Sequence, residues 1–300
     1  MSQRTDTIVN GVLIVDKPSG LTSHDVVARV RRILKEKAVG HLGTLDPLAT
    51  GVLPLVLGNM TRLAQFYLAS EKSYEGMIRF GFATDTYDAE GERVGPEEQP
   101  SLSLERVCEM AARFRGEIEQ MPPPFSAKKV HGIPAYRLAR QKKPVLLEKI
   151  KVSVKEFEIV ELEGARARFR ARVASGTYMR SVAHDMGQMA GCGAHLESLR
   201  RTAVAEFELK DAHTLEELER SALGGEAIEE LLVHPRKLLP SIPAVTATEE
   251  IAARIRHGRP VNLPELSRAR EVKVFYGQRE LIAISTRVAG TLFHPRIVLG

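Results

Sequence analysis

The segment GHLGTLDPLATGVLPLVLG, residues 40 to 58, holds one carboxylate in a run almost free of charge. That carboxylate is Asp46, with His41 five residues before it and Pro47 directly after it. An aspartate before proline often hydrogen-bonds its own turn, and the segment alone favours that structural role. A carboxylate held away from water can also act as a nucleophile or base. Because burial would protonate it, that second role requires a fixed cation nearby.

Segments on both sides of Asp46 are expected to build the scaffold that positions it. Alternating and continuous apolar runs predict strands, and an i, i+3, i+4 pattern predicts helices. Ser23 is a candidate N-cap for a helix that starts near Asp25. The other elements expected around the site are strands at 11–15, 52–58 and 73–82, and helices at 104–114 and 176–191.

A proline-rich stretch, PRKLLPSIPAV at 235–245, separates this part from the end of the chain. After it come one short helix and several strands, EVKVFYG, ELIAIST and LFHPRIVL. This pattern predicts a separate small β-rich module. The expected boundary places one domain at 1–240 and the module at 241–300.

Composition and charge limit the class of protein. No apolar run approaches the length of a membrane span, and the N-terminus lacks the apolar core of a signal peptide. Cys108 and Cys192 are far apart, which argues against a disulfide framework and indicates a cytoplasmic protein. Residues 126–201 carry a net charge of +9 in a chain of net +5. This basic middle indicates a polyanionic partner such as nucleic acid, or a solvated basic face that binds nothing.

The segment ARARFRARV, 165–173, places four arginines on one face of a strand and apolar residues on the other. The arginine spacing, about 6.6 Å, would suit a phosphate backbone. The favoured alternative pairs the arginines with glutamates of the neighbouring strand, which lies one hairpin away. Those glutamates are Glu156, Glu158, Glu161 and Glu163.

Five segments in order carry a resemblance to a known family: DKPSGLTS, GHLGTLDPLATGVLPLVLG, EKSYEGMIRFG, GTYMRSVAHDMG and AHLESLRRT. Together they resemble the tRNA pseudouridine synthase B (TruB) family, bacterial type, over roughly residues 11–240. The resemblance implies an α+β fold, with a mixed, largely antiparallel sheet flanked by helices. The C-terminal module resembles, more weakly, a PUA-like RNA-binding domain.

Enzymes of this family isomerise uridine 55 in the T-loop of tRNA to pseudouridine. The glycosidic bond breaks, the uracil rotates, and the base is rejoined through carbon, without cofactor or metal. The family's aspartate corresponds to Asp46. It either attacks C1′ of the ribose or assists proton loss from C2′ to give a glycal, and the sequence leaves both routes open.

The resemblance also implies roles for the residues around Asp46. Arg180 matches the arginine that pairs with the aspartate and lowers its pKa. Tyr74 matches the tyrosine that stacks on the uracil, and its hydroxyl is a candidate proton acceptor. Leu199 matches an apolar residue of the base pocket, and Tyr178 matches a substrate contact.

RNA contacts are expected at several other positions. His41 matches a histidine that stacks in the rearranged T-loop, from which the uridine must be extruded. Lys17 and Arg62 fall in family-like motifs and are expected to bind substrate. Asp16, Asp88 and Asp185 also fall in family-like motifs. For Asp88 and Asp185 a structural role, hydrogen bonding in loops and helix caps, is favoured. A basic cluster after a proline-rich loop resembles a phosphate clamp: Lys128, Lys129, Arg137, Arg140, Lys142 and Lys143.

His131, His195 and His213 lack metal-ligand spacing, so no metal is expected, and Met186 and Met189 are expected in the core. The expected partner is the T-arm of tRNA, bound by a monomer without an obligatory protein partner. Two alternatives remain open. One is a guide-RNA-dependent, dyskerin-like synthase, and the other is a non-catalytic RNA-binding or tRNA-folding protein.

Overall fold

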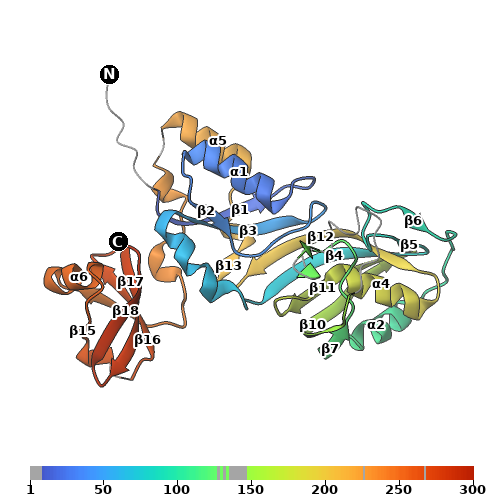
Figure 1. Cartoon of the computed structure of the whole chain (residues 1–300). Helices are drawn as coiled ribbons and strands as arrows, with labels where there is room; N and C mark the ends of the chain where they lie inside the picture. The colour runs from blue at the N-terminus through green and yellow to red at the C-terminus, as the bar shows by residue number, and fades with distance from the viewer. Residues whose placement is uncertain (1–8, 127–128, 131–132, 135–146, 226, 267) are drawn as a thin grey trace.

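The computed structural model describes residues 9–126, 129–130, 133–134, 147–225, 227–266 and 268–300. Two sheets dominate it: nine strands in the larger and five in the smaller. Figure 1 shows the smaller sheet beside one end of the larger one. No helix in these described ranges is long and apolar enough to cross a membrane.

The large sheet has the order β1-β3-β12-β4-β11-β10-β7, with β2 paired to β3 and β13 to β12. Its strands are β1 (Gly11–Lys17), β2 (Val39–His41), β3 (Thr50–Leu57), β4 (Lys72–Phe80), β7 (Gly116–Gln120), β10 (Ile150–Glu163), β11 (Arg166–Val173), β12 (Ala194–Val204) and β13 (Phe207–Glu208). Only the β3–β12 pair among these is parallel, so the sheet is mixed and largely antiparallel as predicted.

Four helices pack with the large sheet through one apolar cluster (Figure 1). They are α1 (Ser23–Leu34), α2 (Leu104–Ala112), α4 (Met179–Ala190) and α5 (Leu215–Gly224). Met186 is fully buried in this cluster, and Met189 packs against it, as expected. Helix α1 is capped by Thr22 and not by Ser23, because the Ser23 hydroxyl binds the backbone of Leu45 instead.

The small β-rich module is present as a sheet of order β14-β16-β17-β18-β15. Its elements are β14 (Ala244–Ala247), α6 (Glu249–Arg256), β15 (Val261–Asn262), β16 (Glu271–Tyr276), β17 (Glu280–Ala289) and β18 (Leu292–Val298). A second apolar cluster joins it to β1, β3 and the 3-10 helix η1 (Gly58–Tyr67). Across this contact Arg62, expected to bind substrate, donates to the carbonyl of Val298 at 2.6 Å.

The remaining short elements connect these parts. They are β5 (Ala83–Thr84), β6 (Arg93–Val94), β8 (Lys129–Val130), β9 (Ile133–Pro134), and the 3-10 turns η2 (Leu209–Asp211), η3 (Ile228–Glu230), η4 (Pro235–Lys237) and η5 (Pro264–Leu266). Lys129 begins β8. Lys128 and the other members of the predicted basic cluster lie outside the described residues, so the phosphate clamp stays a prediction.

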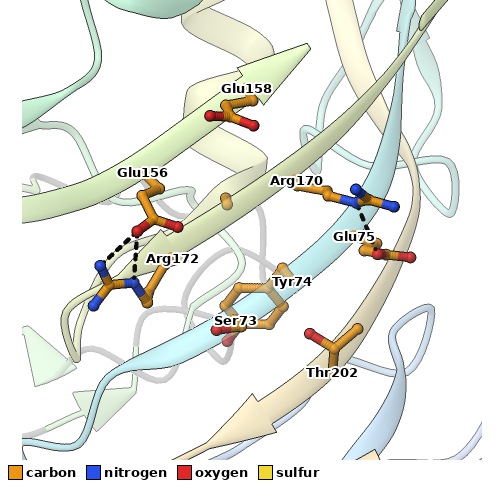
Figure 2. A pocket seen from close by; sticks show the side chains of 9 residues that line it. Ser73, Tyr74, Glu75, Glu156, Glu158, Arg170, Arg172 and Thr202 are labelled. Carbon is orange, nitrogen blue, oxygen red and sulfur yellow. Dashed lines mark hydrogen bonds and ion pairs between the residues drawn. The ribbon is translucent and has the colours of Figure 1, made fainter. Parts of the chain in front are cut away.

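The arginine face of β11 is paired with glutamates, as the favoured interpretation expects, but only two of the four arginines pair with the predicted strand β10. Arg172 contacts Glu156 at 2.6 Å and Arg168 contacts Glu161 at 3.1 Å, both across the β10–β11 pair. The other two arginines find partners on β4 and β12: Arg170 with Glu75 and Arg166 with Glu197. A shallow pocket of about 190 Å³ lies on this face. Figure 2 shows two of the ion pairs along it.

Gly51 lies opposite Arg201 where β3 pairs with β12. Its φ is +100°, and a Cβ there would lie 2.2 Å from the carbonyl oxygen of Arg201. Any side chain would therefore separate the two strands or distort the start of β3, which directly follows the loop that carries Asp46, residues 42–49 (the Asp46 loop).

We expect Gly51→Ala to lower the free energy of unfolding by at least about 3 kcal/mol, measured by denaturant titration. Gly116→Ala is the matched control, because its φ is +90° and no heavy atom lies within 4 Å of a Cβ there. That control carries the backbone strain alone and should lose only about 1 kcal/mol. Equal losses in the two variants would show that the close approach to Arg201 does not exist.

Candidate active site

The predicted ion pair between Arg180 and Asp46 is present. Nε of Arg180 lies 2.9 Å from Oδ2 of Asp46. Arg180 stands in the first turn of α4, where its side chain is only 7% exposed, whereas the Asp46 side chain is 38% exposed. The carboxylate of Asp46 is thus held from one side by a buried cation and remains open on another.

A second carboxylate shares the same guanidinium. Oδ2 of Asp88 lies 3.3 Å from Nη1 of Arg180, and the Asp88 side chain is only 4% exposed. Nη2 of Arg180 donates to the carbonyl of Phe125 at 3.0 Å. Of the two carboxylates only Asp46 has appreciable exposure, so Asp46 is the one placed to meet a substrate.

Asp88 also makes the loop hydrogen bonds that the sequence favoured. Its Oδ1 accepts from the hydroxyl of Thr86 at 2.6 Å and from the backbone N–H of Glu90 at 3.1 Å. The loop interpretation is therefore confirmed but incomplete, since the other carboxylate oxygen holds Arg180. The mostly polar context TDTYDAEG gave no signal that this aspartate would be buried.

The backbone on both sides of Asp46 is held by hydrogen bonds from three residues of the stretch 17–23. The hydroxyl of Ser23 binds both the N–H and the carbonyl of Leu45, at 2.8 and 3.1 Å. The carbonyl of Pro47 accepts from Gly20 N–H at 2.9 Å and from Lys17 Nζ at 3.2 Å. These bonds satisfy a loop that would otherwise bury unpaired carbonyls, and they fix the direction of the Asp46 side chain.

Lys17 does not occupy the position expected of a substrate contact. Its side chain is fully buried, and its ammonium also donates to the carbonyls of Leu21 and Pro18, at 2.6 and 2.8 Å. Burial lowers the pKa of Lys17 to about 8, although the nearby Asp46 opposes the shift. With no exposed surface, Lys17 cannot contact RNA in this structure, and it holds the Asp46 loop instead.

The aromatic and apolar site residues lie on elements next to that loop. Tyr74 on β4 and Leu199 on β12 are buried in the same apolar cluster as Leu45. Tyr178 is the N-cap of α4, two residues before Arg180. Burial raises the pKa of the Tyr178 hydroxyl, with Arg180 opposing and Asp46 adding to the shift. Of these residues Tyr178 lies near enough to act electrostatically on both Asp46 and Arg180, and Tyr74 and Leu199 belong to the apolar cluster that includes Leu45.

His41 ends β2 and is half-buried, and its Nδ1 has no hydrogen-bond partner among the described residues. Burial lowers the pKa of His41, and the charge of Arg201 lowers it further. A neutral imidazole with a free ring nitrogen suits stacking, but its role in RNA binding stays a prediction.

Two further residues of the site were not predicted. Gln120, at the end of β7, fixes Tyr178 by donating to its carbonyl at 3.0 Å and accepting from its N–H at 2.8 Å. Arg201 is fully buried beside the Asp46 loop. The doubled arginine directly after Leu199 was a signal for the second, because strand alternation turns one of the pair inward.

The other residues singled out in the sequence are held within the fold. Asp16 accepts from Arg200 at 2.7 Å, and Asp185 is half-buried. His195 is buried with Nδ1 3.2 Å from the carbonyl of Phe82. Within the described part of the chain, no group of three or more histidine, cysteine or acidic side chains is placed to hold a metal ion.

Comparisons with known proteins agree with this geometry. The model of the TruB family pseudouridylate synthase N-terminal domain matches residues 31–179, and the tRNA pseudouridylate synthase B C-terminal domain matches 180–239. A tRNA pseudouridine synthase B from Solibacter usitatus is 50% identical, covering 97% of this chain and 100% of the relative. The chain belongs to the TruB family of pseudouridine synthases.

Two other similarities extend over nearly the whole chain. The tRNA pseudouridine synthase B of Azoarcus sp. is 39% identical, over 97% of this chain and 95% of its own. A solved structure of an H/ACA RNP bound to a substrate RNA containing 2′-deoxyuridine matches with a TM-score of 0.70 and 25% identity. That match covers 97% of this chain and 85% of the other, and it supports the fold at greater evolutionary distance.

The charges around Asp46 predict a pH dependence. Desolvation raises the pKa of Asp46, Arg180 opposes this, and the like charge of Asp88 raises it further. An ionised Asp46 then requires a pH above this raised pKa, and pseudouridine formation should fall as the pH drops through it.

We expect Asp88→Asn to move the acid limb of kcat/KM to lower pH, because it removes the like charge and leaves Arg180 to Asp46 alone. The measurement is the pH profile of pseudouridine formation by the parent and the variant. Glu97→Gln, which breaks only exposed ion pairs with Arg79 and Arg93, serves as the control. An acid limb that stays in place or moves to higher pH would contradict this account of the site.

Proposed function

We propose that this protein converts uridine 55 in the T-loop of tRNA to pseudouridine, with Asp46 as the reacting group. The observation that carries the proposal is the 2.9 Å pair between buried Arg180 and partly exposed Asp46. An oxygen kept charged and partly open to a substrate is what attack on C1′, or proton removal from C2′, requires.

The surrounding residues supply the other needs of this reaction. Tyr74 and Leu199 offer an apolar, aromatic surface to a uracil that has left the base stack. Extrusion of the uridine costs a few kcal/mol, which binding of the T-arm must offset. His41 and the basic residues after the proline-rich loop are candidates for that binding.

The tRNA substrate is supported by the names of the relatives, and the T-arm by the sequence resemblance. We infer that residues 1–240 form the catalytic domain and residues 241–300 a PUA-like module that adds RNA contact. The module is joined to the rest by a shared apolar cluster and by the Arg62 hydrogen bond. A monomer acting in the cytoplasm without a guide RNA is the simplest form of this proposal.

We expect Asp46→Asn to abolish tritium release from [5-³H]uridine-labelled tRNA, with a rate loss of at least about 10⁴-fold. Asparagine preserves the shape of the side chain and removes only its charge. The C5 hydrogen leaves when the base is rejoined through carbon, so tritium in water reports the complete reaction. Asp211→Asn is the matched control, since Asp211 is exposed in η2 and lies outside the site motifs.

The parent enzyme should also modify a naked T-arm stem-loop at one uridine, located by carbodiimide mapping. Activity only in the presence of a guide RNA would support the dyskerin-like alternative. Binding of the T-arm without tritium release would support a non-catalytic protein. Undiminished release by Asp46→Asn would refute the role of Asp46.

A further inference from the structure

Arg201 is the largest fully buried side chain in the described structure, and it carries a charge. Among the described residues, no carboxylate forms an ion pair with its guanidinium, although Asp46 lies near enough to act on it electrostatically. Burying an arginine in this way costs several kcal/mol unless other groups replace its hydration. The groups that replace this hydration identify the segments that Arg201 connects.

Three of these groups are backbone carbonyls on the two sides of Asp46. Nη2 donates to Gly43 at 3.0 Å and Nη1 to Thr44 at 3.2 Å, both before Asp46 in the chain. Nε donates to Val52 at 2.8 Å, beyond the end of the loop. One planar group thus ties the entry and the exit of the Asp46 loop to each other.

The fourth group is the hydroxyl of Tyr74. Arg201 lies opposite Tyr74 across the antiparallel β4–β12 pair and opposite Gly51 across the parallel β3–β12 pair. This register brings the Tyr74 side chain close enough for its phenol to act electrostatically on the guanidinium. A guanidinium has donors only, so in a contact between the two groups the tyrosine oxygen is the acceptor.

We propose that Arg201 is a positioning residue that holds the Asp46 loop and the Tyr74 hydroxyl in one fixed relation. β12 lies between the strand that follows Asp46 and the strand that carries Tyr74, and Arg201 reaches both from there. It does not touch substrate, because it has no exposed surface. This inference rests on the proposed function for the reaction in which Asp46 and Tyr74 act.

The fork of the guanidinium is essential to this role. A lysine in its place would keep the charge but has a single nitrogen. That nitrogen cannot reach the carbonyls on both sides of the Asp46 loop and the Tyr74 side chain on β4 at the same time. We therefore expect Arg201→Lys to lower the single-turnover rate constant by about 100-fold, as displacements near 1 Å do. The dissociation constant for tRNA should change less than about threefold.

The matched control is Arg200→Lys, on the same strand. Arg200 is half-exposed and binds Asp16 and Thr50 without contacting Tyr74. It should keep a rate constant near that of the parent. A merely structural role for Arg201 would lower Tm and the reaction amplitude while leaving the rate constant of the folded fraction intact, and that result would overturn the proposal.

A second measurement does not require an Arg201 variant to fold. Tyr74→Phe leaves one guanidinium N–H without its acceptor, so its Tm should fall by about 2–5 °C. A Tm equal to that of the parent would overturn the contact between Arg201 and Tyr74. Because this readout involves no RNA, it is independent of the proposed function, which fails instead if the parent releases no tritium from tRNA.

Discussion

The site depends on one buried guanidinium shared by two carboxylates. Arg180 lies 2.9 Å from Asp46 and 3.3 Å from Asp88, so one positive charge is set against two negative ones. Asp88 is enclosed and Asp46 is partly open, which leaves the excess negative charge where a substrate can reach it. If Asp46 were the sole carboxylate bound to Arg180, its charge would be neutralised more completely. The guanidinium would then lack the second anchor that Asp88 provides.

Three separate segments must meet for this arrangement to form. Asp46 comes from the loop before β3, Arg180 from the first turn of α4, and Asp88 from the loop after β5. Tyr87 fixes the last of these to α4 by stacking on His184, with ring centroids 3.8 Å apart. The φ of Tyr87 is 66°, a left-handed conformation that costs a tyrosine about 1–3 kcal/mol. The fold therefore accepts local strain directly beside Asp88.

Much of this architecture could be predicted from local pattern. Strands β1, β3 and β4 and helix α4 follow from apolar runs and periodicity, and the pairing of the β11 arginines follows from alternation. The contact between Asp46 and Arg180 could be expected only from the family resemblance, because nothing in the spacing of two residues 134 apart indicates it. Periodicity also missed β2, which is only three residues long.

The sequence did not predict which charged side chains are buried, because burial depends on segments that are distant in the chain. Lys17 ends β1 where a polar loop begins and is expected to bind substrate, yet three carbonyls satisfy its ammonium inside the protein. The residues next to Asp88 in the sequence are those of an ordinary surface turn, so they do not indicate its burial. Arg200 and Arg201 are adjacent and chemically identical, and only the partner strands decide which one is buried.

The central claim is that Arg180 keeps Asp46 ionised at the pH where the enzyme works. The most direct test is titration of the Asp46 carboxyl by ¹³C NMR in the parent and in Arg180→Met, with Asp46→Asn used to assign the signal. The account predicts a carboxylate at neutral pH in the parent, and a pKa higher by about 1–3 units in Arg180→Met. An unchanged titration of Asp46 in that variant would contradict it.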